Sequence, residues 1–270
     1  MRGVSQESFA EGQERLETLL DSGGSDPSGL GDALFAVTEV LDANPALRRA
    51  LTDPARDGDA KATLVQRLFG AKVRGEAVDL VAGLVRARWG RSGDLTDAVE
   101  YLAVTSVLAG AEAAGRLDAV EDELFRFGRT IEGDQALRDA FSYRTAGVDR
   151  KVELVRRLLQ ARAAPETVRL AEQAAARPRG LRTEQVLEHF VQAAADRRQQ
   201  TVAHVVAATP LTTEQRNRLE VALRRRYGRV RLNVDVDPSV VGGLRVQIGS
   251  ELVDGTVEAR LDEARRRLAG

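Results

Sequence analysis

Histidine titrates closest to neutral pH among the side chains, yet the 270 residues contain only two, His189 and His204. His189 lies among apolar residues with helical spacing, and His204 alternates with valines as in a strand. Neither belongs to an H-x-x-x-H or H-E-x-x-H pattern, the spacings that place two imidazoles on one metal ion. We therefore interpret both as structural residues and predict no metal site.

The sequence also lacks the usual signatures of nucleophilic and phosphate chemistry. It has no cysteine, which excludes disulfides, thiolate catalysis and cysteine-ligated zinc or iron. No serine lies in a G-x-S-x-G turn, and no G-x-x-x-x-G-K-[ST] or G-x-G-x-x-G loop is present to hold a phosphate. The pair Gly242-Gly243 precedes a predicted strand, where backbone freedom explains it. We predict no bound cofactor.

Carboxylates are abundant, with 41 Asp and Glu residues, but almost all of them stand near arginines on polar helix faces. Asp254 stands out because it precedes Gly255 at the start of a last predicted helix. An N-cap role explains this position. A hydrolase that uses acidic residues near Asp254 is an alternative, although no second group is placed to act with it.

Arginines gather towards the end of the chain, at residues 224–226 and again at 265–267. Binding to a phosphate backbone needs a sustained positive excess, whereas the net charge is −1 and aromatic residues make up only 4%. Pairs one helical turn apart, such as Glu220 and Arg224, indicate solvated helix faces. Nucleic-acid binding through these arginines is the alternative function, and it predicts an affinity that falls steeply with salt.

Composition and hydropathy favour a helical interaction protein without membrane spans. Hydrophobic residues make up 43% and charged residues 30% of a chain long enough for one large domain or two to three small ones. No run approaches the roughly 18 apolar residues of a spanning helix. The segment from Met1 to Phe9 has no apolar stretch typical of a signal peptide, so we expect a cytoplasmic protein.

Apolar residues recur with a period near 3.6 through the first 200 residues. The pattern predicts helices throughout 100–200 and, before them, at 7–20, 30–42, 44–51, 59–69, 76–89 and from 94 onward. Asn44 is the expected N-cap before Pro45, and Asp59 is the expected N-cap of the helix 59–69.

Three sequence blocks recur at a constant shift of 90 residues (137 − 47, 154 − 64 and 168 − 78). The matched pairs are Asn44–Leu51 with Asp134–Phe141, Asp59–Phe69 with Asp149–Leu159, and Val78–Leu80 with Val168–Leu170. Because all three blocks keep one register, we predict an internal duplication of a set of helical hairpins.

The helix expected from residue 94 onward contains Val104–Ala111, a segment rich in small side chains. Small side chains let a second backbone approach closely. Two interpretations stay open: tight packing inside the chain's own bundle, or a groove for a helix of a partner protein.

After residue 200 the period changes from 3.6 to 2. Strands are expected at 201–208, 230–236, 244–248 and 251–253. A helix capped by Thr212 or Thr213 and ended by Gly228 separates the first two strands, with Leu219, Leu223 and Tyr227 on one face. A final helix carries Val257, Leu261, Ala264 and Leu268 on one face.

The expected fold class is therefore α+β. An all-α helical bundle region with an internal duplication comes first, and a small C-terminal α/β domain follows.

Four segments of this C-terminal domain, taken in order, resemble one known family. They read Pro210-Leu-Thr-x-Glu-Gln-x-x-Arg-Leu219, Leu232-Asn-Val-x-Val-Asp237, Val241-Gly-Gly-Leu-Arg-Val-Gln-Ile-Gly249 and Val253-Asp-Gly-Thr-Val-x-x-Arg-Leu261. The series resembles the delta subunit of F-type ATP synthases, whose mitochondrial relative is the oligomycin sensitivity-conferring protein. The resemblance covers about residues 101–270, with Asp149-x-Lys-x-x-Leu-Val-x-Arg-Leu158 at its usual place. The extra first 100 residues resemble the longer actinobacterial form.

The resemblance implies a non-catalytic stator subunit without a cofactor. In this family the N-terminal bundle binds the N-terminal helices of alpha subunits, and the C-terminal domain binds the b subunits of the peripheral stalk. Such a subunit stops the catalytic head from rotating during proton-driven ATP synthesis. It implies no nucleic-acid partner and no direct membrane insertion, and a peripheral location on the cytoplasmic side of the cell membrane.

The resemblance also implies domains and partner-binding residues. Residues 1–100 form the extra helical copy, 101–200 the alpha-binding bundle, and 201–270 the stalk-binding domain. The resemblance leaves open which helical copy binds the alpha helix, and we favour the second because it directly precedes the C-terminal domain. In the family the groove for the alpha helix lies between the first and fifth helices of the bundle, here 101–114 and 166–176. The candidates on these helices are Val104, Val107, Leu108, Val168 and Leu170.

Overall fold

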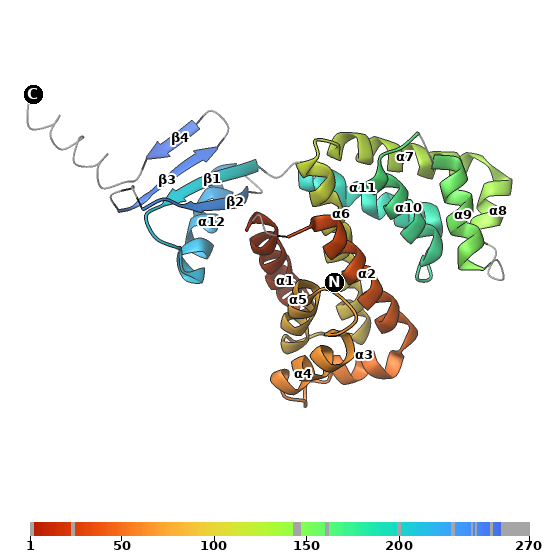
Figure 1. The fold of residues 1–270 in the computed structure, drawn as a ribbon, viewed down its shortest axis with the longest axis horizontal. Helices are drawn as coiled ribbons and strands as arrows, with labels where there is room; N and C mark the ends of the chain where they lie inside the picture. Colours follow the sequence, from red (N-terminus) through yellow and green to blue (C-terminus); the bar gives the residue numbers. More distant parts are fainter. Residues whose placement is uncertain are drawn as a thin grey trace, which may run out of the picture. The chain divides into compact units, whose positions relative to one another are not determined.

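The chain divides into two compact units, Met1–Arg197 and Arg198–Gly270. The computed structural model describes residues 3–22, 25–142, 147–159, 162–198, 201–227, 230–238, 240, 242–248 and 251–254. Over these residues the first unit is helical, and the second contains a four-stranded sheet and a helix (Figure 1). The predicted α+β class is confirmed.

The helical unit contains two copies of one series of helices. Helices α2 to α5 correspond to α7 to α10, and every first and last residue is shifted by 90 positions (117 − 27 for α2 and α7). The predicted internal duplication is therefore confirmed. The bounds are α1 Val4–Asp21, α2 Pro27–Ala43, α3 Pro45–Thr52, α4 Gly58–Phe69, α5 Gly75–Arg86, α6 Ser92–Ala113, α7 Leu117–Gly133, α8 Gln135–Ser142, α9 Val148–Leu159, α10 Pro165–Ala176 and α11 Thr183–Arg198.

Helix α6 belongs to both copies. Shifted by 90 residues, α1 falls on residues 94–111, which lie inside α6, while the counterpart of α6 itself is α11. The helix that ends the first copy therefore also begins the second. The boundary expected between residues 100 and 101 falls within this unbroken helix, and helices of both copies pack against it.

Two expected helix caps differ from the observed ones. Asp57, rather than Asp59, caps α4, because its carboxylate accepts a hydrogen bond from the backbone N–H of Ala60 at 2.9 Å. Asp59 lies in the first turn of α4 and pairs with Arg86 instead. Asn44 does occupy the N-cap position of α3, but its side-chain amide donates to the carbonyl of Val40.

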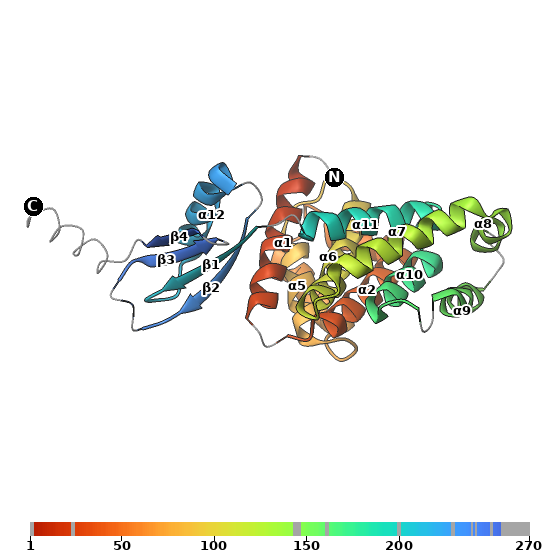
Figure 2. The ribbon, with the colours of Figure 1, turned by 90° about the horizontal axis from the view of Figure 1, so that it is seen from above.

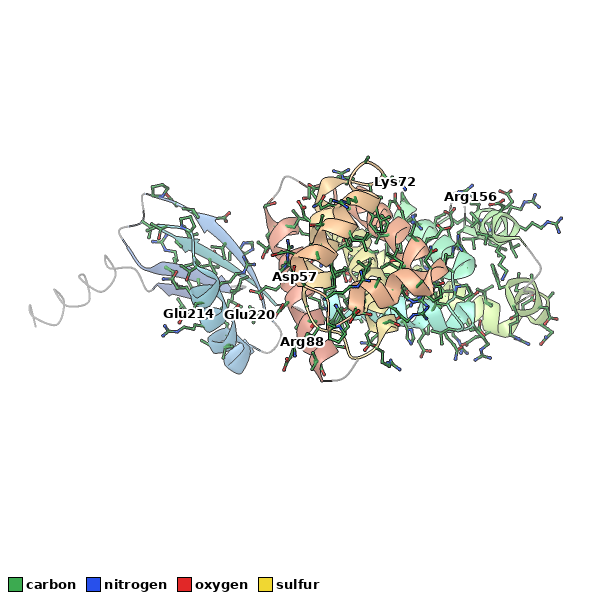
Figure 3. All side chains as sticks on the ribbon, turned by 90° about the horizontal axis from the view of Figure 1, so that it is seen from below. Asp57, Lys72, Arg88, Arg156, Glu214 and Glu220 are labelled. Atoms are coloured by element: carbon green, nitrogen blue, oxygen red, sulfur yellow. The ribbon has the colours of Figure 1, made fainter. Side chains whose placement is uncertain are left out.

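Both copies contribute to one hydrophobic core. Its cluster includes fully buried leucines of the first copy, of the shared helix and of the second copy, namely Leu16, Leu34, Leu102, Leu124 and Leu187. Charged side chains lie around the outside, among them Asp57, Lys72 and Arg156 (Figure 3). Among the described helices, none combines the length and the apolar run that crossing a membrane requires.

The second unit is built on a mixed sheet with the strand order β2-β1-β3-β4. Strand β1 pairs with β2 in parallel and with β3 antiparallel, and β3 pairs antiparallel with β4. The bounds are β1 Thr201–Ala207, β2 Val230–Val236, β3 Leu244–Ile248 and β4 Glu251–Asp254. Every second residue points into a small core, as the period of 2 predicts; its buried members are Ala203, Val205, Val230, Leu232, Val246 and Ile248.

Helix α12, Thr213–Tyr227, connects β1 to β2 and packs against β2 (Figure 2). Thr212 caps it reciprocally: its hydroxyl accepts from the N–H of Gln215, whose side chain accepts from the N–H of Thr212. Leu219 and Leu223 pack on the sheet cluster as predicted. The C-cap Gly228, the side chains of Tyr227 and Asp254, and the expected last helix lie outside the described residues.

Candidate functional site

The five residues expected to bind a partner lie on two neighbouring helices. Val104, Val107 and Leu108 belong to α6, Val168 and Leu170 belong to α10, and the two helices pack against each other. Four of these side chains expose 2% of their area or less, and Val168 is half-buried. The structure thus places the five residues on two helices that contact each other, and it places four of the five in the core.

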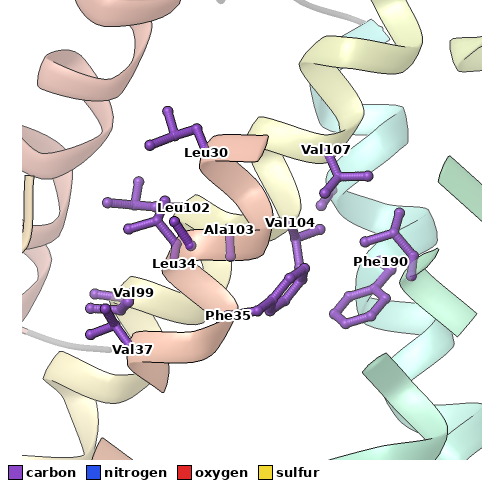
Figure 4. Packing of buried hydrophobic residues seen from close by; sticks show 14 of the residues in the cluster. Leu30, Leu34, Phe35, Val37, Val99, Leu102, Ala103, Val104, Val107 and Phe190 are labelled. Carbon is purple, nitrogen blue, oxygen red and sulfur yellow. The ribbon is translucent and has the colours of Figure 1, made fainter. Parts of the chain in front are cut away.

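Helix α2 of the first copy covers the adjoining face of α6 (Figure 4). A Cβ added to Gly31 of α2 would lie 2.6 Å from Val107 Cγ2 and 3.0 Å from the carbonyl oxygen of Ala103. A Cβ added to Gly110 of α6 would lie 2.8 Å from the hydroxyl of Ser28. The helix admitted by the small residues of Val104–Ala111 is therefore α2, which favours the interpretation of packing within the bundle.

The aromatic ring of Phe35, a residue of α2, faces α6 and Arg169 of α10. It lies beside Val104 in Figure 4, and only 3% of its area is exposed. On the α10 side, the Arg169 guanidinium carbon lies 4.6 Å from the ring centroid, and the same guanidinium pairs with Asp32. A cation over an aromatic face contributes roughly 0.5–2 kcal/mol, more as water is excluded.

Two further arginines hold the same face of α2, and with Arg169 we call them the arginine clamp. Arg177 pairs with Glu39, one turn beyond Phe35. Arg179, with 16% of its side chain exposed, pairs with Asp42 at 3.3 Å and with two carboxylates of α6. The clamp therefore fixes α2 along the boundary between α6 and α10.

The pairs of Arg179 on α6 are Asp97 at 2.7 Å and Glu100 at 2.6 Å. Burial raises the pKa of Glu100, and the Arg179 guanidinium partly offsets that effect. Arg179 also has a φ of 48°, a left-handed conformation that costs a non-glycine residue roughly 1–2 kcal/mol. The three ion pairs stabilise this turn between α10 and α11.

The resulting site is a helix-binding groove whose occupant is part of the same chain. Apolar side chains of α6 form its floor, α10 forms one wall, and guanidinium groups reach across to a line of carboxylates. Within the described ranges no group of three or more His, Asp or Glu side chains could hold a metal ion. His189 and His204 are exposed and lie in different units.

Comparison with known proteins identifies the family. Residues 104–268 match the family model described as the ATP synthase delta (OSCP) subunit. The ATP synthase subunit delta of Kineococcus radiotolerans is 52% identical over 269 residues, which cover 99% of this chain and 98% of that protein. The chain belongs to the ATP synthase delta (OSCP) family. The predicted resemblance is therefore confirmed.

A second curated relative also matches the whole chain, whereas a solved structure matches only part of it. The subunit delta of Streptomyces griseus is 48% identical over 271 residues, which cover 100% of both proteins. A chain of the Toxoplasma gondii mitochondrial ATP synthase hexamer covers 62% of this chain at 21% identity, with a TM-score of 0.27 that is too low to inform the fold. The family model begins inside α6, whereas the full-length delta relatives also match the first copy.

The sequence did not predict the arginine clamp. Its partners stand far apart, for example Asp32 and Arg169, and no local spacing connects them. One signal was present on α2, where Asp32, Phe35, Glu39 and Asp42 follow each other at three or four positions and so share one face. The side chains of Arg224–Arg226 and all residues from 255 onward, which the nucleic-acid alternative uses, lie outside the described residues.

Proposed function

We propose that this chain is the non-catalytic stator subunit of an F-type ATP synthase. It links the N-terminal helices of the alpha subunits in the catalytic head to the b subunits of the peripheral stalk. It lies peripherally on the cytoplasmic side of the cell membrane and takes part in proton-driven ATP synthesis. The observation that carries the proposal is family membership along the whole chain.

The division into two units supports two separate attachments, one to the alpha subunits and one to the b subunits. The helical unit contains a groove whose chemistry already holds one helix, which supports its role towards the alpha subunits. The α/β unit, residues 201–270 in the sequence-based division, is the part that we assign to the b subunits. Residues 1–100 add the helix α2 that fills the groove.

Binding of an alpha helix at Val104, Val107, Leu108, Val168 and Leu170 requires α2 to leave the groove. Leaving would expose Leu30, Leu34, Val37 and Leu41, which have no exposed area. At roughly 1.5–3 kcal/mol for each large apolar side chain, the cost is about 6–12 kcal/mol. An alpha helix that does not repay this cost must bind a surface that α2 leaves open.

The test is calorimetric titration of the full chain with a synthetic peptide of the alpha-subunit N-terminus from the same organism. We expect saturable one-to-one binding, and a folded sample that shows none contradicts the proposed link to the head. The variant Phe35→Ala, which weakens the hold on α2, locates the site. A higher affinity than wild type places the peptide in the groove, and an unchanged affinity places it elsewhere.

The stalk attachment needs its own titration, with a peptide from the C-terminal end of the b subunit. We expect binding by the full chain that a saturating amount of the alpha peptide leaves intact, because different units hold the two peptides. Competition between the peptides would contradict this division of roles.

A further inference from the structure

Phe125, near the middle of α7, is the most exposed large apolar side chain among the described residues of the helical unit, with 55% of its area accessible. Figure 1 draws α7 along the upper edge of that unit. Single exposed apolar residues are ordinary on protein surfaces, so exposure alone indicates nothing. The duplication supplies the second observation, because it pairs Phe125 with Phe35 (125 − 35 = 90).

In the first copy, the face of α2 that contains Phe35 is fully engaged. Arg169 covers the ring and pairs with Asp32, and Arg177 pairs with Glu39. Arg169 and Arg177 are eight positions apart in the second copy, and their partners Asp32 and Glu39 are seven positions apart on α2. The face of α2 is therefore a docking face whose occupants are Arg169 of α10 and Arg177, the residue that follows α10.

In the second copy, the same face of α7 is open to solvent. The equivalents of Asp32, Phe35 and Glu39 are Asp122, Phe125 and Arg129, and all three are exposed. Asp122 pairs with Arg126, and Arg129 pairs with Glu132, each within one turn of α7. Such exposed pairs contribute little to stability, so they do not commit this face to its present arrangement.

The first helical copy of another molecule of this protein does not match this face. The first-copy residue equivalent to Arg169 is Asp79 (169 − 90), and the equivalent of Arg177 is Ala87. If α5 of another molecule docked on α7 as α10 docks on α2, Asp79 would lie against Asp122. Like charges at an interface repel.

Helix α10 of another molecule does not match either, because Arg169 is already engaged with Asp32 and Phe35 of its own chain. Arg177, in addition, would lie against Arg129. The occupant is therefore a different polypeptide.

We propose that the face of α7 formed by Asp122, Phe125 and Arg129 docks an amphipathic helix of another protein. That helix carries an arginine that stacks on Phe125 and pairs with Asp122. About eight positions further it carries a carboxylate, because Arg129 stands where the first copy has Glu39. The inference rests on the proposed function, which supplies the assembly that contains the partner.

The test replaces Phe125 with the photoreactive residue p-benzoylphenylalanine in the chain assembled into purified ATP synthase. The matched control carries the same residue at Val148, which is 39% exposed at the start of α9. We expect position 125, and not 148, to cross-link to a helical segment of another subunit with an arginine and an acid about eight positions apart. No cross-link from 125, or one to a segment without an arginine, overturns the proposal.

A second measurement separates this proposal from the proposed function. Phe125→Ala is expected to weaken retention of the chain on the complex by about tenfold, the loss of one partly desolvated cation–aromatic contact. Because Phe125 is exposed, its removal leaves the unfolding midpoint unchanged. A wild-type chain that does not co-purify with the complex contradicts the proposed function; one that does, with Phe125→Ala retained equally well, contradicts the docking face alone.

Discussion

The first and second helical copies have the same helix bounds but different surroundings. In the first copy, α2 lies against the shared helix α6 and is held by the arginine clamp, so Phe35 is 3% exposed. In the second copy, α7 also packs against α6, α8 and α10, but its Phe125 is 55% exposed. The same residue type at equivalent positions is a core residue in one copy and a surface residue in the other.

This difference follows from the sharing of α6. Because one helix ends the first copy and begins the second, the groove of the second copy opens directly towards α2. No third copy follows within the described chain, so the equivalent face of α7 stays open. A duplicated sequence can therefore have two roles, depending on which neighbour follows each copy.

The largest expected effect comes from one substitution made in each copy. Phe35→Ala should cost roughly 3–5 kcal/mol of unfolding free energy, because it empties a packed core position. Phe125→Ala should stay within about 0.5 kcal/mol of wild type, because it changes an exposed position. Urea unfolding followed by helical circular dichroism measures both, and equal costs would contradict the comparison.

Removal of the central arginine of the clamp tests how α2 is held. Arg179→Gly suits the left-handed backbone but leaves Glu100 buried near two other carboxylates, and should cost about 1–3 kcal/mol at pH 7. Without the guanidinium, the pKa of Glu100 rises further above its ordinary value of 4.5. The folded state then binds the proton more tightly, so the deficit should shrink as the pH falls through that raised pKa. A deficit that is constant between pH 7 and 5 would contradict this account.

Two glycines test the close approach of α2 and α6. Gly31→Ala adds a Cβ 2.6 Å from Val107 Cγ2 and should cost about 1–3 kcal/mol. Gly133→Ala, on α7, has open space around its Cβ and should gain up to about 1 kcal/mol from helix propensity. The first copy already has Ala43 at this position. Thermal unfolding reports the signs, and a stabilising Gly31→Ala would show that the helices can separate cheaply.

The smallest expected effect concerns an ion pair within the second copy. Burial opposes ionisation of Glu166, but hydrogen bonds from Arg116 outweigh it and hold the pKa of Glu166 below its ordinary 4.5. The pair therefore stabilises the folded state above pH 4.5, and this contribution is lost as the pH falls through the lower folded-state pKa. Glu166→Gln should lower stability slightly at pH 7 and flatten its acid limb. Parallel pH profiles for the two proteins would contradict this assignment.

Much of the fold could be predicted from local patterns. The shift of 90 residues predicted the duplication, and alternating valines and leucines predicted all four strands. The cap of α4 was assigned two residues late, because Asp57 and Asp59 are chemically alike and only the backbone shows which one accepts from Ala60. The five candidate residues were recognised as apolar positions of neighbouring helices, but the burial of four of them in the core was not predicted.

The sequence by itself determined the family, the repeat and the period of each segment, because these depend on short motifs and on their order and spacing along the chain. Only the tertiary structure decided that α6 serves both copies and that Arg169 of α10 reaches Asp32 and Phe35 of α2. Those facts depend on contacts such as Asp32 with Arg169, which join residues distant in sequence. Hydrophobic periodicity specifies that a face will be buried, whereas the partner that buries it is selected by shape and charge across the whole fold.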